Sequence, residues 1–192
     1  MVVADQITAV VAAGGRSTRF GTDKATYVFE GQRMVDRLAG IAGPVSKRVM
    51  VGLPPTEHSH PAGWSQLSEE YTIVRDHPAG IGPMGCLRAS LSRADTPWIL
   101  LVACDLPSLG TDHLQLLLDA ARDDTAAVVA VGSEGFPEPL CALYHRLIAP
   151  RIEAAVAKKN YAMHRVLSSP DIIRVRLPDS ALSNMNFRDC PD

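Results

Sequence analysis

The segment Trp98–Cys104 constrains the fold more than any other, because all of its residues are apolar. A strand with one solvent-facing side alternates apolar and polar residues, whereas a strand covered by helices on both faces is apolar throughout. The segment is also far shorter than the roughly 20 residues that a membrane-spanning helix needs. It therefore predicts a central strand of a sheet that is buried on both faces.

Short apolar strands alternate with amphipathic helical patterns along the rest of the chain. The other predicted strands are Thr8–Ala13, Arg48–Val51, Thr72–Arg75, Ala126–Val131, Cys141–His145 and Ile172–Arg176. Helices are predicted over Met34–Ile41 and around Met84–Leu91, Leu114–Ala121 and Ile148–Val156. This order predicts an α/β fold of three layers, in which a mostly parallel sheet has helices on both faces. The stretch Gly52–Gly63 is the most loop-like, but no linker divides the chain, so residues 1–192 are expected to form a single domain.

The overall charge of the chain argues against polyanionic macromolecular partners. Lys and Arg total 19 against 21 Asp and Glu, so we expect binding neither to nucleic acid nor to a membrane. The start, Met1–Asp5, lacks the basic residues of a secretory signal. The cysteines form no C-x-x-C pair, and we interpret them as free thiols in a reducing, cytoplasmic compartment. They are Cys86, Cys104, Cys141 and Cys190.

A glycine pair and three cations follow the first predicted strand. Parallel sheets bind ligands at the carboxyl ends of their strands, where Gly14 and Gly15 lie. Their backbone N–H groups could cradle phosphate oxygens, and Arg16, Arg19 and Lys24 add positive charge. The spacing matches neither the Walker A nor the G-x-G-x-x-G motif. A phosphate-binding loop is the preferred interpretation, and a solvated turn is the alternative.

An acidic residue, Asp105, directly follows the central strand. A carboxylate at the end of a buried strand is held rigidly at the ligand-binding edge of the sheet. Mg²⁺ uses one or two protein carboxylates together with substrate phosphates, which suits this position. Asp-x-Pro sequences also open turns, so the local sequence leaves a metal ligand and a turn residue equally open.

The first loop resembles a known family. The run AAGGRSTRFGTDK, from Ala12 to Lys24, is similar to the L-A-G-G-x-S-x-R-M-G-x-D-K loop of the molybdopterin nucleotidyltransferases, in particular the guanylyltransferases. This resemblance implies a Rossmann-like fold and a loop that wraps a nucleoside triphosphate. It also implies catalytic roles for Arg19, Lys24 and Asp105, with Mg²⁺ on Asp105, since Cys104-Asp105-Leu106-Pro107 resembles the family's metal motif. The nucleotide-binding residues implied in and after the first strand are Ala12, Ala13, Gly14, Gly15, Arg16 and Lys24.

Three further positions resemble the nucleotide-binding residues of this family. They are Gly52, Asp76 and Gly82, and Asp105 is expected to contact the nucleotide as well as the metal. Gly52 supplies no side chain to recognise a base. Cys86 stands where the family more often has glycine, so the ligand geometry beside it is open. A plain turn is the alternative role for Asp76.

The second half of the chain carries the candidate residues for the acceptor substrate. The resemblance implies that Asn184 and Asn186 lie near the pterin, since they match the N-x-N of a late family motif whose Thr-Pro-Glu is replaced here. Arg165 belongs to a basic cluster that is either an anion site for the acceptor phosphate or a solvated helix face. The segment from Glu138 to Tyr144 resembles the family's E-P-L-x-A-L-Y strand, which we interpret as core sheet except for Glu138.

The resemblance implies transfer of GMP from Mg-GTP to Mo-molybdopterin, with release of pyrophosphate. The implied partners are GTP and molybdopterin, with transient contact to molybdenum-insertion proteins or target molybdoenzymes. One alternative is a cytidylyltransferase or a sugar-phosphate nucleotidyltransferase on the same fold. Another is a nucleotide-binding homologue without catalytic activity. The six histidines show no metal-binding spacing, and there is no G-x-S-x-G elbow of an α/β-hydrolase.

Overall fold

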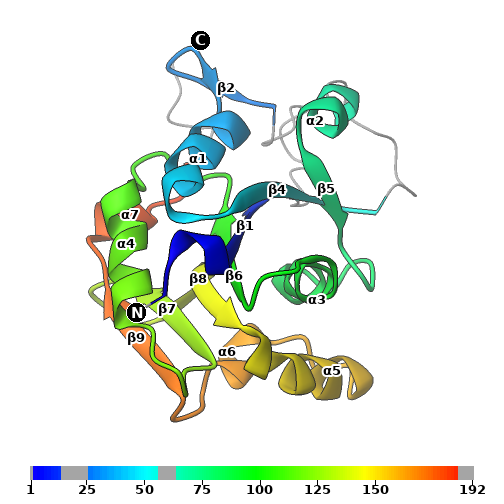
Figure 1. Cartoon of the computed structure of the whole chain (residues 1–192), viewed down its shortest axis with the longest axis vertical. Helices are drawn as coiled ribbons and strands as arrows, with labels where there is room; N and C mark the ends of the chain where they lie inside the picture. The colour runs from blue at the N-terminus through cyan, green and yellow to red at the C-terminus, as the bar shows by residue number, and fades with distance from the viewer. Residues whose placement is uncertain (1, 14–25, 56–63, 186–192) are drawn as a thin grey trace.

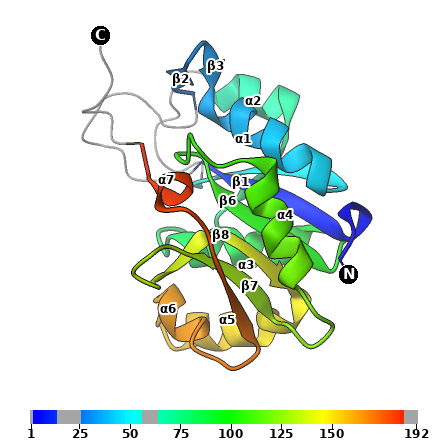
Figure 2. The same cartoon turned by 90° about the vertical axis from the view of Figure 1, so that its left-hand side faces the viewer.

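The computed structural model describes residues 2–13, 26–55 and 64–185, and it is built around one seven-stranded sheet (Figures 1 and 2). The strand order across the sheet is β5-β4-β1-β6-β8-β7-β9. The strands are β1 (Ile7–Ala12), β4 (Arg48–Leu53), β5 (Thr72–Arg75), β6 (Trp98–Ala103), β7 (Ala127–Val131), β8 (Pro137–His145) and β9 (Ile172–Arg176). The α/β class and the central place of Trp98–Cys104 are confirmed.

The sheet is parallel except for β8. β1 pairs in parallel with both β4 and β6, β4 with β5, and β7 with β9. β8 runs antiparallel to β6 and to β7. Residues 132–136 alone separate β7 from β8, which is enough for a hairpin but too short for the crossover that a parallel pair requires. Because β6 and β7 are both antiparallel to β8, their carboxyl ends lie at the same edge of the sheet.

Helices cover both faces of this sheet and make three layers. The longer helices are α1 (Met34–Ala42), α3 (Pro83–Arg93), α4 (Thr111–Ala120) and α5 (Ala149–Ala157), and the shorter ones are α2 (Trp64–Glu70), α6 (Met163–Val166) and α7 (Asp179–Leu182). One core contains buried side chains of α1, α2, α4 and α7, and the other contains those of α3, α5 and α6. Figure 2 shows the two helix layers on opposite sides of the strands.

The alternation of side chains along β6 explains why this strand is apolar throughout. Leu100 and Val102 pack into the core beneath α1 and α4, whereas Ile99 and Leu101 pack into the core beneath α3 and α5. All four side chains are fully buried. Burial of each such side chain contributes about 1.5–3 kcal/mol, so both faces of this strand stabilise the fold.

Several elements differ from the expectations. The prediction that Gly52 lies in a loop is wrong, because β4 extends to Leu53. β8 begins at Pro137, before the predicted Cys141, since Pro137 and Glu138 pair with β7 across a register shift. The small hairpin of β2 (Val28–Phe29) and β3 (Gln32–Arg33) was not predicted, nor were α2, α6 and α7, because such short elements carry little periodicity.

No helix in residues 2–13, 26–55 or 64–185 is long and apolar enough to cross a membrane. Cys86 and Cys141 are buried free thiols, as expected, and Cys104 is buried as well. Cys190 lies outside the described residues.

Candidate functional site

The carboxyl ends of the central strands bring several predicted residues together. The strand register pairs Ala12 with Gly52 on one side and with Ala103 on the other. Beyond the strands, the Ala13 amide donates to the Gly52 carbonyl at 2.8 Å, and the Cys104 amide donates to the Ala12 carbonyl at 3.1 Å. Ala12, Ala13 and Gly52 therefore form one backbone platform directly beside the segment that carries Asp105.

Asp105 is held by its own backbone as well as by the strand before it. It is half-buried, and its carbonyl accepts a hydrogen bond of 2.9 Å from the amide of Met185. This bond brings Asn184, which is exposed, next to Asp105 from far along the chain. The sequence predicted both residues for one site, and the backbone bond between their segments gives that prediction a geometric basis.

Asp76 lies at the same edge, one strand further out. Val74 of β5 pairs with Gly52, and the Asp76 amide donates to the Leu53 carbonyl at 3.1 Å. Burial raises the pKa of the Asp76 carboxyl to about 6, although a hydrogen bond from the Cys86 thiol partly offsets this effect. Within the described residues, Asp76 Oδ1 is buried and has no hydrogen-bond partner. An unpaired buried acceptor is costly, and an N–H or O–H group of a ligand would satisfy it.

The thiol of Cys86 fills the space beside Gly52. A Cβ placed on Gly52 would lie 2.5 Å from Cys86 Sγ, closer than real Cβ contacts come. Cys86 is 4% exposed, and burial, followed by the charge of Asp76, raises the pKa of its thiol. This neutral thiol forms the wall between Gly52 and Asp76. The sulfur of Cys86 therefore occupies the room that Gly52 leaves.

The start of α3 closes this part of the edge. Gly82 precedes the helix with φ +64° and ψ −144°, a conformation that favours glycine, and Pro83 occupies the first turn as expected. A Cβ on Gly85 would lie 2.9 Å from the Pro78 carbonyl oxygen. These glycines let the loop after Asp76 fold tightly against the helix, so the positive end of the α3 dipole faces the edge.

Arg165 lies on α6, a helix that follows α5. α5 follows β8, which ends at the opposite edge of the sheet. α5 then runs back beside α3, and an ion pair between Arg88 and Glu153 joins the two helices. α6, which carries Arg165, comes after this return and lies beside α5 in Figure 2. Arg165 is exposed, and no contact among the described residues joins it to Asp105. Its role in binding an anion therefore stays a prediction.

The remaining predicted residues lie outside the described part of the chain. They are Gly14, Gly15, Arg16, Arg19, Lys24 and Asn186. Their placement relative to Asp105 is therefore untested, and their roles stay predictions.

The residues present fit a metal that is shared with a substrate. The described residues contain no group of three or more His, Cys, Asp or Glu side chains suited to hold a metal ion. A single carboxylate at the end of a rigid strand, such as that of Asp105, suits Mg²⁺ only when phosphates supply further oxygen ligands. The donor set thus favours a cation that binds together with a phosphorylated substrate.

The chain is similar in sequence to a known family of proteins. The model of the "MobA-like NTP transferase domain" family matches residues 9–174. A Deinococcus radiodurans protein named "Probable molybdenum cofactor guanylyltransferase" is 33% identical over 151 residues, covering 79% of this chain and 74% of its own length. A Mycobacterium marinum protein of the same name is 33% identical over 184 residues, covering 92% and 87%.

The fold is found in solved structures as well. A crystal structure of an Aquifex aeolicus VF5 protein superposes with a TM-score of 0.74 over 96% of this chain and 95% of that one, at 22% identity. The match to the family model extends from β1 to β9 and includes every described strand of the seven-stranded sheet except the ends of the first and last. The chain belongs to the family of MobA-like NTP transferases.

Proposed function

We propose that this protein transfers GMP from GTP to Mo-molybdopterin and releases pyrophosphate. The observation that carries the proposal is the gathering of Ala12, Asp76 and Asp105 at one sheet edge in a chain of this family. Several relatives, including the proteins from Deinococcus radiodurans and Mycobacterium marinum, are named molybdenum cofactor guanylyltransferases.

The nucleotide would lie over the ends of β1, β4 and β5. The backbone of Ala12, Ala13 and Gly52 would lie close to the ligand. Asp76 Oδ1 is a buried acceptor without a hydrogen-bond partner among the described residues, and a donor of the nucleotide would satisfy it. Gly82 lets the start of α3 approach the same ligand. We propose that the triphosphate is bound by Gly14, Gly15 and Arg16 together with Arg19 and Lys24, because guanidinium and ammonium groups bind phosphate strongly.

Transfer would be a single in-line displacement. An oxygen of the acceptor's terminal phosphate forms a bond to the α-phosphorus of GTP, and the bond from that phosphorus to the bridging oxygen breaks. The electron pair leaves with pyrophosphate. A phosphate monoester is largely ionised near pH 7, so no strong general base is needed. Positioning and charge neutralisation dominate catalysis of such transfers, which assigns the main task to Arg19, Lys24 and Asp105.

Asp105 would hold a divalent cation, which we propose to be Mg²⁺. When bound, the cation supplies positive charge that reduces the repulsion between the two phosphate-bearing substrates. The acceptor would lie on the far side of Asp105 from Asp76, near Asn184 and Asn186, and Arg165 would bind its phosphate. Transient docking to a molybdenum-insertion protein or to a target molybdoenzyme would supply the acceptor or remove the product.

The test is an assay of the purified full chain with Mg²⁺, molybdopterin-bearing acceptor and either GTP or CTP. We expect the guanine dinucleotide product by mass spectrometry, together with one pyrophosphate for each product molecule. Asp105→Asn should lower the rate by about 10²–10³-fold, the scale for loss of one electrostatic stabiliser of the transition state.

Other outcomes would separate the alternatives. Gly52 has no side chain that could select guanine over cytosine. Equal or better use of CTP would therefore identify a cytidylyltransferase. Nucleotide binding without pyrophosphate release would identify a protein that has kept the fold without the chemistry. An Asp105→Asn variant of wild-type activity would remove the metal from the proposal.

A further inference from the structure

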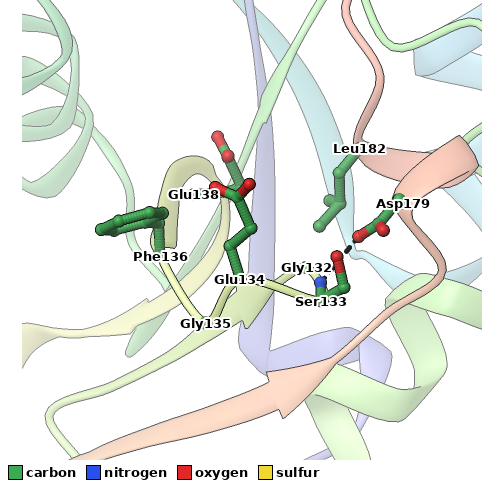
Figure 3. A pocket seen from close by; sticks show the side chains of 8 residues that line it. All are labelled: Gly132, Ser133, Glu134, Gly135, Phe136, Glu138, Asp179 and Leu182. Carbon is green, nitrogen blue, oxygen red and sulfur yellow. Dashed lines mark hydrogen bonds between the residues drawn. The ribbon is translucent and has the colours of Figure 1, made fainter.

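A cavity of about 260 Å³ lies beyond Asp105, on the side of the sheet away from Asp76. Residues 132–136, which join β7 to β8, form one wall, and α7 forms the other (Figure 3). Figure 3 shows Glu134 and Glu138 extending to the same side of this turn, and Asp179 and Leu182 facing the turn from α7. Among the cavity residues, the sequence singled out Glu138 alone, because an irregular turn and a four-residue helix carry no pattern.

The cavity opens at the same sheet edge as the candidate site. The chain runs from Leu182, in the cavity wall, to Met185, whose amide donates to the Asp105 carbonyl at 2.9 Å. Three residues span at most about 11 Å, so the cavity lies within the length of a small molecule from Asp105. In the strand order, β6 with Asp105 stands between β4 and β5 on one side and β8 and β7 on the other. Two substrates could therefore approach Asp105 from opposite sides.

The charge of the cavity decides which part of a substrate fits it. Glu134 and Glu138 pair with no cation among the described residues, so a phosphate group would be repelled. The three acidic side chains of the lining are not arranged to hold a metal either, as no such group exists in the described parts of the chain. The Asp179 carboxylate is already engaged, since Oδ1 accepts a hydrogen bond of 2.7 Å from the Ser133 amide. The free carboxylates thus exclude an anionic group and can accept hydrogen bonds from the N–H donors of a ligand.

An aromatic ring and a half-buried carboxylate complete the binding surface. Phe136, which lines the cavity, is 69% exposed, so its ring face is available to a ligand. Burial raises the pKa of Glu138, which lies where β8 pairs with Ala130. A carboxylate accepts two parallel N–H bonds from a 2-amino-4-oxopyrimidine ring, and a phenyl ring stacks on its face.

We propose that this cavity binds the pterin ring of the acceptor, with Glu138 accepting its N–H groups and Phe136 covering one face. The inference rests on the proposed function, because the acceptor named there carries such a ring. Guanine presents the same donor pattern, but the nucleotide is assigned to the opposite side of Asp105. Placing the pterin here directs the acceptor's phosphate away from Glu134 and Glu138 and toward Asp105.

The binding test uses 6-hydroxymethylpterin, which has the ring but no phosphate, and follows its fluorescence on titration with the full chain. We expect saturable binding that is weakened about tenfold in Glu138→Gln and severalfold in Phe136→Ala, as loss of one charged hydrogen bond or one stacking contact predicts. Glu69→Gln, an equal change of charge at an exposed position of α2, should bind like the wild type. An excess of cytidine, whose ring lacks the two adjacent N–H donors, should not displace the probe.

Three results would overturn the inference: no saturable binding of the probe, unchanged binding by both cavity variants, or equally strong displacement by cytidine. Because guanine carries the same N–H donors as the pterin, a raised KM for GTP in Glu138→Gln would assign the cavity to guanine instead. The kinetic arm separates this inference from the proposed function. Glu138→Gln should raise the KM for the acceptor about tenfold and leave the KM for GTP unchanged. If the wild type transfers GMP but neither cavity variant changes the acceptor KM, the cavity assignment is wrong and the function stands. If the wild type transfers no GMP, the function fails and the probe titration alone decides the cavity.

Discussion

Cys86 Sγ occupies the space that a side chain at position 52 would need, and Gly52 leaves that space empty. A Cβ built on Gly52 would stand 2.5 Å from this sulfur, whereas its distance from Val10 Cγ1 would be an ordinary 3.4 Å. Gly52 lies on β4 and Cys86 lies on α3. Considered alone, Gly52 supplies no side chain to a ligand, and Cys86 adds bulk beside the site. Together they make a packed wall beside Asp76, so the two features are complementary.

Gly52→Ala should destabilise the protein by about 1–3 kcal/mol, the usual cost of overpacking a dense core. Cys86→Ala in the same chain should recover much of this loss, because it removes the sulfur that the new methyl group meets. A double-mutant cycle of free energies of unfolding in urea measures the coupling. Gly40→Ala is the matched control, since a Cβ there would meet no atom within 4 Å beyond its chain neighbours and its own helix backbone, and alanine favours the helix by up to about 1 kcal/mol. Additive losses at positions 52 and 86 would contradict this contact.

Asp76→Asn should change how stability depends on pH. Burial raises the pKa of Asp76 from 3.8 to about 6, so the folded state binds a proton more tightly than the unfolded state. The stabilisation that this carboxyl group contributes to the folded state is fully present below about pH 4 and is lost as the pH rises through 6. It amounts to about 1.4 kcal/mol for each pKa unit by which the folded and unfolded states differ. Asp76→Asn should therefore flatten the decline in the free energy of unfolding between pH 4 and 6.

Asp171→Asn provides a control of opposite sign for this pH series. A hydrogen bond from Arg151 lowers the pKa of Asp171 to about 2. Its stabilising contribution is present above about pH 4 and is lost as the pH falls toward 2. Because the pair is partly exposed to solvent, its contribution should be about 1 kcal/mol or less. Identical pH profiles for wild type and Asp76→Asn would show that the carboxyl is not shifted in solution.

Asp105→Asn should remove activity without unfolding the protein. The bond that joins this segment to Met185 uses the Asp105 carbonyl, which the variant retains. Asparagine also has nearly the shape of aspartate, so the free energy of unfolding should change by less than about 1 kcal/mol, whereas the transfer rate should fall by about 10²–10³-fold. Chelation of divalent cations should likewise abolish transfer in the wild type, and added Mg²⁺ should restore it. Loss of folding in parallel with activity would assign Asp105 a structural role instead.

Gly132→Ala should displace α7 from the turn after β7. A Cβ at position 132 would lie 2.6 Å from Asp179 Oδ1, which already accepts the Ser133 amide. Loss of that hydrogen bond should cost about 1–2 kcal/mol of stability. Differential scanning calorimetry of Gly132→Ala, Asp179→Ala and the double variant tests this. We expect the double variant to be little worse than Asp179→Ala alone, and fully additive losses would contradict the contact.

The sequence by itself determined the elements whose side chains repeat with a clear period. Trp98–Cys104 was predicted as a strand buried on both faces, and the structure confirms it because alternate side chains enter two different cores. The placement of Asp105 after this strand followed directly, since a residue after a parallel strand must lie at the carboxyl edge. Local patterns suffice for such elements because burial depends on the spacing of apolar residues along one segment.

Only the tertiary structure decided which distant segments meet. It joined Met185 to Asp105, set Cys86 against Gly52, and closed a cavity between Glu138 and α7. These contacts depend on strand order and on backbone hydrogen bonds between segments, and neither leaves a periodic trace in the amino-acid sequence. The half-buried state of Asp76 has the same origin, because the desolvation that shifts its pKa is supplied by residues of another element.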